Sequence, residues 1–286
     1  MKKLKLIAQT MYKKTINLVI SLLVLISCNK ANGIQDIPPG SFANDSPAIK
    51  IMTYNIRHAA PIHHSIYDIQ LDSIAEIINQ QKPDLVALQE IDVHTKRSGV
   101  SLDQAKELGK LTGMNYYFSR SIDYEGGEYG VAILSRFPIK GHERYTLPMP
   151  DTSGERRSVA MVTIEMFPGV EVRFASTHLD LTVENRMAQV NELNRISKQS
   201  ESPMILAGDL NSRPQSKEMQ TLRQEFIFPC VTDCPLTSPS DNPRATIDYI
   251  ILNPAAAKIF KVSDYKAINN LSASDHLPLT AQFRKK

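Results

Sequence analysis

The sequence is short of cysteine, tryptophan and excess basic charge. Its 286 residues include three cysteines and no tryptophan, and aromatic residues make up 7% of the chain. Two of the cysteines, Cys230 and Cys234, have no Cys or His beside them in the sequence, which excludes a metal site at this pair. Their spacing is that of a local staple, which an exported protein could oxidise to a disulfide. No internal repeat or low-complexity segment is present, which argues against a repeat architecture.

The first 28 residues have the pattern of an export signal. Five lysines and no acidic residue lie in residues 1–14, and an almost unbroken apolar run follows over residues 16–27. This run is shorter than the ~20 apolar residues needed to span a bilayer. It ends at Leu25-Ile26-Ser27-Cys28, which resembles the lipobox of bacterial lipoproteins. We therefore predict a lipoprotein signal peptide over residues 1–27 and lipidation of Cys28. An ordinary secretory signal and an uncleaved membrane anchor are the alternatives.

Loss of residues 1–27 changes the charge balance. The formal net charge of +3 includes the five N-terminal lysines, so the mature chain carries about −2. Proteins that bind nucleic acid gain much of their affinity from Lys and Arg contacts with phosphates. The sequence therefore predicts no general nucleic-acid-binding surface, although it leaves a local basic cleft open.

Residues 28–47 are rich in turn formers and poor in periodic apolar residues, which predicts a tether. Residues 48–286 follow without a second linker and are enough for one large domain with a well-buried core. This organisation predicts a monomer at the cell envelope, either periplasmic or on the cell surface, with its lipid in the membrane.

Short apolar runs typical of strands alternate with amphipathic helical stretches through the predicted domain. The run over residues 49–54 ends at Asn55, and the run over residues 85–88 ends at Gln89-Glu90. Loops at strand ends present binding and catalytic groups on a rigid frame. We therefore expect one cleft assembled from many loops, and its candidate residues are Asn55, Glu90, His178, Asp209, Asn211, Asp248, Asp275 and His276.

These eight residues supply carboxylate, amide and imidazole groups and no thiolate. Such a hard donor set suits Mg²⁺, or Mn²⁺, better than zinc. Hydrolysis of a phosphate ester requires neutralisation of the phosphoryl oxygens, a water nucleophile and stabilisation of the leaving oxygen. A metal ion on carboxylates covers part of this, and a histidine hydrogen-bonded to an aspartate covers proton transfer. Each residue alone has a structural explanation, but the set favours a metal-dependent phosphoesterase.

Six segments in order carry a resemblance to a known family. They are Thr53-Tyr54-Asn55-Ile56-Arg57, Leu88-Gln89-Glu90, Ser176-Thr177-His178-Leu179, Gly208-Asp209-Leu210-Asn211, Thr246-Ile247-Asp248-Tyr249-Ile250 and Ser274-Asp275-His276-Leu277-Pro278. These segments resemble the successive motifs of the endonuclease/exonuclease/phosphatase superfamily, over residues 49–283. The resemblance implies an α/β fold, a four-layered α/β sandwich of two packed mixed β-sheets flanked by helices.

The resemblance also implies roles for the residues that match its motifs. Glu90 corresponds to the principal metal ligand, with Asn55 and Asp275 beside the metal, directly or through water. Arg57 stands where apurinic endonucleases of this superfamily carry an acidic residue, which favours one tightly held metal.

The remaining motif residues are implied to be catalytic. His276 corresponds to a general base or phosphate-stabilising group oriented by Asp248. Asp209 and Asn211 correspond to residues that position the water and a phosphoryl oxygen. His178 corresponds to a group that stabilises developing charge or assists the leaving group.

Three arginines are candidate substrate ligands, because a planar guanidinium binds phosphate oxygens through two donors. They are Arg57, Arg97 and Arg157, and an exposed structural role is the alternative for Arg97 and Arg157. The leading hypothesis is hydrolysis of a small or lipid-borne phosphodiester or phosphomonoester at the envelope. Its rivals are a surface nuclease, in which Lys96 and Arg156 would extend the basic groove, and a non-catalytic binding lipoprotein.

Overall fold

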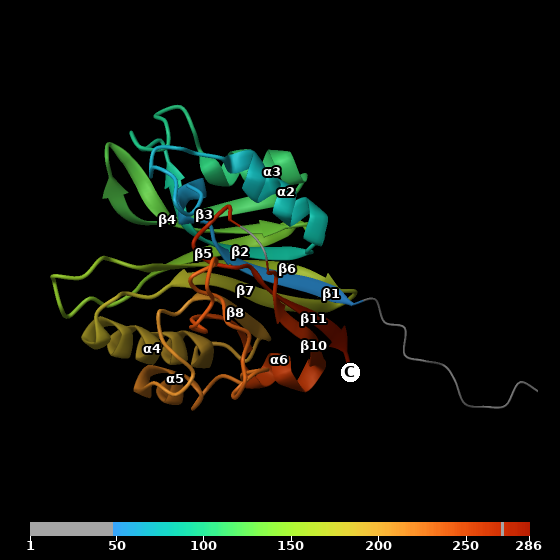
Figure 1. Cartoon of the computed structure of the whole chain (residues 1–286). Coiled ribbons are helices and arrows are strands. Elements are labelled where there is room, and N and C mark those ends of the chain that lie inside the picture. Colours follow the sequence, from blue (N-terminus) through green and yellow to red (C-terminus); the bar gives the residue numbers. More distant parts are fainter. Residues whose placement is uncertain (1–47, 270–271) are drawn as a thin grey trace, which may run out of the picture. The chain divides into compact units, whose positions relative to one another are not determined.

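The computed structural model describes residues 48–269 and 272–286 (Figure 1). The predicted signal peptide, Cys28 and the predicted tether lie outside the described residues. Within the described ranges, no helix has the length and apolar character required to cross a membrane.

The strands of the described chain form two mixed sheets. The six-stranded sheet has the order β10-β11-β1-β2-β4-β3, and the five-stranded sheet has the order β5-β6-β7-β8-β9. The pairs β1/β2 and β7/β8 are parallel and the other pairs are antiparallel. The strands are β1 (Ile49–Asn55), β2 (Leu85–Val93), β3 (Asn115–Tyr124), β4 (Gly127–Ser135), β5 (Ile139–Thr146), β6 (Ser158–Phe167), β7 (Val170–His178), β8 (Met204–Asp209), β9 (Asp248–Leu252), β10 (Phe260–Ala267) and β11 (Leu279–Lys285).

Side-chain caps mark the start of α3 and of α6. The side chain of Asp103 accepts a hydrogen bond from the backbone of Lys106 and begins α3, which ends at Gly113 in the left-handed conformation. Asn253 caps α6 in the same way, with Pro254 in the first turn. The helices are η1 (Arg57–Ala59, a 3₁₀ turn), α2 (Leu71–Gln81), α3 (Gln104–Thr112), α4 (Val183–Lys198), α5 (Lys217–Leu222) and α6 (Pro254–Ile259).

Three apolar cores separate four layers. In β1, Ile49 and Ile51 point into the core between the two sheets, whereas Met52 and Tyr54 point into the core beneath α2 and α3. A third core lies between the five-stranded sheet and helices α4 and α5. Figure 1 shows α2 and α3 on one outer side and α4 and α5 on the other. The order helix, sheet, sheet, helix confirms the predicted four-layered α/β sandwich.

Two strands that the apolar pattern does not predict lie at sheet edges. β5 borders the five-stranded sheet and β10 borders the six-stranded sheet. Most of their residues are exposed or half-buried. An edge strand with a solvated face carries polar residues and shows little apolar periodicity, so sequence pattern alone misses it.

Alternation along the strands also places four of the candidate site residues, together with Gln89. Asn55, Gln89, His178, Asp209 and Asp248 each lie an even number of positions from a residue of the central core. Side chains two positions apart share one face of a strand. All five therefore point between the two sheets, at one end of the central core.

The loop between α5 and β9 contains a disulfide. It joins Cys230 and Cys234, whose Cα atoms are 5.5 Å apart. The pairing that the sequence left open is therefore formed in the structure.

Candidate active site

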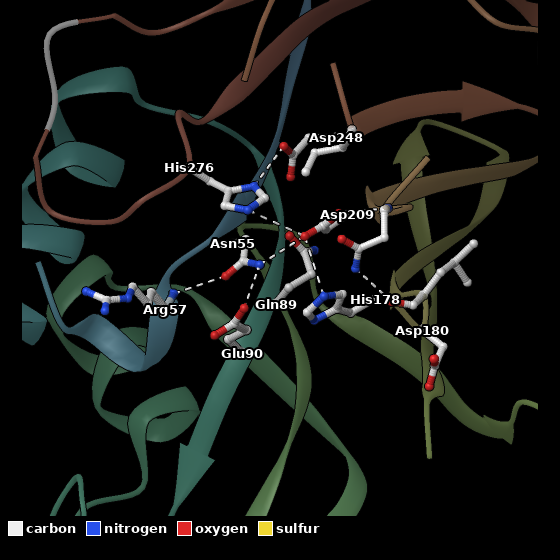
Figure 2. A network of polar contacts seen from close by, with 12 residues as sticks. Asn55, Arg57, Gln89, Glu90, His178, Asp180, Asp209, Asp248 and His276 are labelled. Carbon is white, nitrogen blue, oxygen red and sulfur yellow. Dashed lines mark hydrogen bonds and ion pairs between the residues drawn. The ribbon is translucent and has the colours of Figure 1, made fainter. Parts of the chain in front are cut away.

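Asp209, the last residue of β8, is the centre of a polar network (Figure 2). Its Oδ2 atom accepts a hydrogen bond of 3.1 Å from Asn55 Nδ2. The same oxygen lies 3.4 Å from His178 Nε2 and 3.7 Å from His276 Nε2. Burial raises the pKa of Asp209 to about 7, and neighbouring Asp248 adds to the rise. One buried carboxylate thus joins residues from four separate segments of the chain.

His276 forms the second acid–imidazole contact of the network. Its Nδ1 atom lies 2.9 Å from Asp248 Oδ2, and both residues are buried. Burial alone would lower the pKa of His276, but the charges of Asp248 and Asp209 raise it to about 10. The segment that carries His276 is fixed to β1, because Ser274 Oγ donates a 2.7 Å hydrogen bond to the carbonyl of Asn55. His276 is therefore held in place as a cationic imidazolium at neutral pH.

Glu90 enters the network through a β-bulge. In the pairing of β2 with β4, Gln89 is opposite Val131 and Ile91 is opposite Gly130, so Glu90 is an extra residue. Its φ of 58° is unusual for a residue with a side chain. Regular alternation would turn Glu90 to the face of Leu88, beneath the helices. The bulge instead brings its Oε1 atom to 2.9 Å from Asn55 Nδ2.

The donor atoms of this region fit a divalent cation. Burial raises the pKa of Glu90, and the charge of Asp275 adds to the rise. A cation between Glu90, Asn55 and Asp275 would offset this cost of holding two carboxylates close together. A neighbouring buried group consists of Asp209, Asp248 and His276, whose ligand atoms lie within 4.8 Å of one another. The group of Asp209, Asp248 and His276 has the geometry of a metal site, and Asn55, which also donates to Glu90, joins it to the first group.

His178, at the end of β7, differs from His276 in its partners. Its Nδ1 atom lies 3.1 Å from Nη1 of Arg157, which also forms an ion pair of 2.9 Å with Glu155 Oε1. Burial lowers the pKa of His178 well below its usual range, and the charges of Arg157 and His276 lower it further. The network therefore contains one neutral and one charged imidazole on either side of Asp209.

The structure explains two residues of the Gly-Asp-Leu-Asn segment, Gly208 and Asn211. A Cβ atom at Gly208 would lie 2.0 Å from the carbonyl oxygen of Thr177, so only glycine allows β7 and β8 to approach here. Asn211 has a φ of 47°, which asparagine tolerates. Its backbone N–H donates to Asp209 Oδ1, and its Nδ2 donates to the carbonyl of Leu179. Asn211 thus ties together the ends of two strands.

The three candidate arginines are already engaged by protein groups. Arg57 lies beside the site, with Nε 3.9 Å from Asp275 Oδ2 and Nη1 donating to backbone carbonyls. Arg97 forms a two-donor ion pair with Asp92, at 2.7 and 2.9 Å, and stacks over the ring of Tyr124. Arg157 lies between Glu155 and His178. Their role as phosphate ligands stays a prediction. Each arginine would have to bind phosphate while it is already engaged in an ion pair with an acid or in stacking on a ring.

Sequence reasoning missed several residues of this region. Tyr129 of β4 is buried, and burial raises its pKa well above the usual range, with Glu90 adding to the effect. Glu155 and Asp180 support Arg157 and its loop. Asp180 follows His178 by two positions, and that spacing was the one available signal. The partners of Glu155 are set by tertiary contacts.

The two packed mixed sheets bring buried acids and imidazoles together at one end of the central core. The chain belongs to the Endonuclease/Exonuclease/phosphatase family, whose profile matches residues 52–276. Members of this family are hydrolases that act on phosphoesters with divalent metals, and the buried cluster of Asp209, Asp248 and His276 agrees with that class.

The chain is also similar to individual proteins in sequence or in fold. The protein is 25% identical over 253 residues to the Uncharacterized protein YbhP of Escherichia coli (strain K12), covering 82% of this chain and 96% of that protein. Its fold is similar to that of a mannosyl-6-phosphatase from Bacteroides thetaiotaomicron VPI-5482, with a TM-score of 0.66, 16% identity and coverage of 82% and 99%. The catalytic domain of human Nocturnin with bound sulfate gives a TM-score of 0.61 and 19% identity, with coverage of 84% and 96%.

Proposed function

We propose that this protein is a Mg²⁺-dependent phosphoesterase, with Mn²⁺ as a substitute, that hydrolyses a small or lipid-borne phosphate ester at the cell envelope. The observation that supports the proposal is the convergence on Asp209 of Asn55, His178 and His276. A carboxylate with a pKa of about 7 beside a charged imidazole is a suitable pair for proton transfer and oxyanion stabilisation at neutral pH.

Different residues of the site would carry out different steps of hydrolysis. Mg²⁺ held by Glu90, Asn55 and Asp275 would neutralise phosphoryl oxygens as a Lewis acid. Asp209, whose pKa lies near neutrality, is placed to accept the proton of the attacking water. His276, oriented by Asp248, is placed to stabilise a phosphoryl oxygen through Nε2–H. This geometry favours the phosphate-stabilising role of His276 over the general-base role.

The arrangement of the arginines supports a small substrate over nucleic acid. Arg57, Arg97 and Arg157 are each close to a carboxylate, at Asp275, Asp92 and Glu155. Paired charges contribute little to the positive potential that attracts a polyphosphate backbone. Lys96 and Arg156 are exposed, and they remain the residues on which a nuclease function would depend.

Hydrolysis of defined substrates tests the proposal. We expect the purified chain with Mg²⁺ to hydrolyse p-nitrophenyl phosphate, bis-p-nitrophenyl phosphate or a sugar 6-phosphate, and Asp209→Asn to lose this activity. Asp123→Asn, at an exposed hairpin residue, is the matched control. Cleavage of duplex DNA with strongly salt-dependent binding and no turnover of small esters would favour the nuclease. A binding lipoprotein would be favoured if the wild-type chain turned over neither class of substrate and Asp209→Asn kept the non-catalytic function of the wild type.

The envelope location is proposed from the lipobox-like segment that ends at Cys28. We expect mass spectrometry of the mature N-terminus to show an acylated Cys28 and loss of residues 1–27. Cys28→Ala should release the chain from the membrane fraction. An unmodified mature N-terminus at another residue would contradict the lipid anchor and leave the hydrolase proposal intact.

A further inference from the structure

Arg157 is a buried cation that does not face open solvent. Only 5% of its surface is exposed, and it lies at the start of β6 next to Ser158. Its Nη1 atom is 2.9 Å from Glu155 Oε1 and 3.1 Å from His178 Nδ1. Its Nε atom is buried without a hydrogen-bond partner, so Nη1 is the atom that engages protein groups. Through Nη1 this arginine directs a donor at the side of His178 that faces away from Asp209.

The chemistry of the two groups fixes where the proton of His178 resides. A guanidinium has only N–H donors, so the contact with His178 requires a lone pair on Nδ1. A neutral imidazole carries a single proton, which must then be on Nε2. Nε2 lies 3.4 Å from Oδ2 of Asp209, so the ring donates toward the carboxylate at the centre of the network.

The loop before Arg157 is built to hold this position. The backbone N–H of Glu155 donates a 2.7 Å hydrogen bond to Asp180 Oδ2. The Nδ2 and Oδ1 atoms of Asn185 bind the backbone of Asp151 on both sides of that residue. A Cβ atom at Gly154 would lie 2.3 Å from Asn185 Nδ2 and 2.6 Å from Asp180 Oδ2, so the loop packs against these side chains with no room for a larger residue.

We propose that Arg157, held by Glu155, is a positioning residue that fixes His178 as the tautomer with its proton on Nε2. In this state His178 serves as a hydrogen-bond donor toward Asp209 and toward a phosphoryl oxygen that approaches it. It does not carry protons between water and the leaving group. Proton transfer therefore belongs to Asp209.

Nuclear magnetic resonance of the imidazole nitrogens tests the tautomer directly. In the ¹⁵N-labelled wild-type chain at neutral pH, we expect the shifts of His178 to show a protonated Nε2 and a bare Nδ1. His178→Gln identifies the signals by their loss. In Arg157→Met we expect a mixture of the two tautomers, whereas Arg144→Met, at an exposed arginine of β5, should leave the signals unchanged. A wild-type ring protonated on Nδ1 would overturn the proposal without any variant.

Kinetics separate positioning from substrate binding. Loss of a residue that orients a catalytic histidine should lower kcat about 10- to 100-fold with little change in KM. We expect this result for Arg157→Met and a smaller loss for Arg157→Lys, which keeps one donor. A rise in KM with unchanged kcat and an unchanged His178 tautomer would show that Arg157 is a phosphate ligand instead.

The kinetic test rests on the proposed phosphoesterase activity, and the magnetic resonance test does not. If the wild-type chain hydrolyses no phosphoester but shows the expected tautomer and its loss in Arg157→Met, the proposed function fails and the positioning role stands. If Arg157→Met unfolds, the wild-type spectrum and Arg157→Lys still decide the question.

Discussion

The two sheets contribute different chemistry to the same site. The six-stranded sheet supplies Asn55 and Glu90, and Asp275 precedes its strand β11, so this half offers mainly oxygen donors. The five-stranded sheet supplies His178, Asp209 and Asp248, so its half offers acids and an imidazole. We propose that the first half binds the hard cation and that the second half transfers protons.

Contacts between the two halves show that the site requires both sheets. His276 comes from the segment before β11 of the six-stranded sheet, yet its partner Asp248 belongs to the five-stranded sheet. Gln89 donates to Ser176 Oγ across the same interface, and Ser176 Oγ donates back to the carbonyl of Leu88. The site therefore depends on how the two sheets pack as much as on either set of strands.

Removal of His276, which joins the halves, should have the largest effect. We expect His276→Gln to lower kcat about 10³-fold, because the site loses its charged imidazole, while Mg²⁺ affinity changes less than twofold. Steady-state kinetics and calorimetric Mg²⁺ titration measure the two quantities. His142→Gln, at an exposed histidine of β5, is the control. A large loss of Mg²⁺ affinity would mean that the metal binds at Asp209, Asp248 and His276 instead.

Glu90→Gln should give the opposite pattern, because it alters the oxygen-donor half. We expect Mg²⁺ affinity to fall about 10- to 100-fold, with part of the activity restored at high Mg²⁺. The same titration measures this change. Unchanged metal affinity together with lost turnover would assign Glu90 to proton transfer. That result would contradict the division of roles between the two sheets.

Gly154→Ala tests the support of the acid–imidazole half. The added methyl group would displace Asp180 or Asn185 and shift the loop that carries Glu155 and Arg157, so we expect kcat to fall about tenfold. Gly141→Ala is the matched control, because its Cβ would meet only Thr163 at 4.0 Å. Equal activity of the two variants would show that the loop does not control the site.

The smallest effect expected at neutral pH is on the free energy of unfolding. It involves His58, which follows β1 of the six-stranded sheet. Burial, with the charge of Arg97, lowers the pKa of His58 to about 4 in the folded chain. The unfolded chain then binds the proton first as pH falls below about 6.5, so the fold loses about 3 kcal/mol between there and pH 4. Urea unfolding should show this loss in wild type and a smaller one in His58→Gln. An identical pH dependence of the unfolding free energy in the two proteins would contradict a neutral His58.

The sequence predicted the strands that carry the motifs, because their buried faces are strongly apolar. It did not predict the bulge at Glu90, where an extra residue in the β2/β4 pairing reverses the side-chain direction. It also missed β5 and β10, whose exposed faces lack the apolar pattern. Arg97 was expected to face phosphate, and only the fold shows its ion pair with Asp92.

The sequence alone determined the order of the motifs, the family that they resemble and the chemical types of the site, since these depend on local pattern and residue identity. The tertiary structure decided which histidine is charged and which is neutral. That difference arises because Asp248 lies beside His276 and Arg157 lies beside His178. Electrostatic effects of this kind depend on distances between residues far apart in the chain, and such distances exist only after the two sheets have packed.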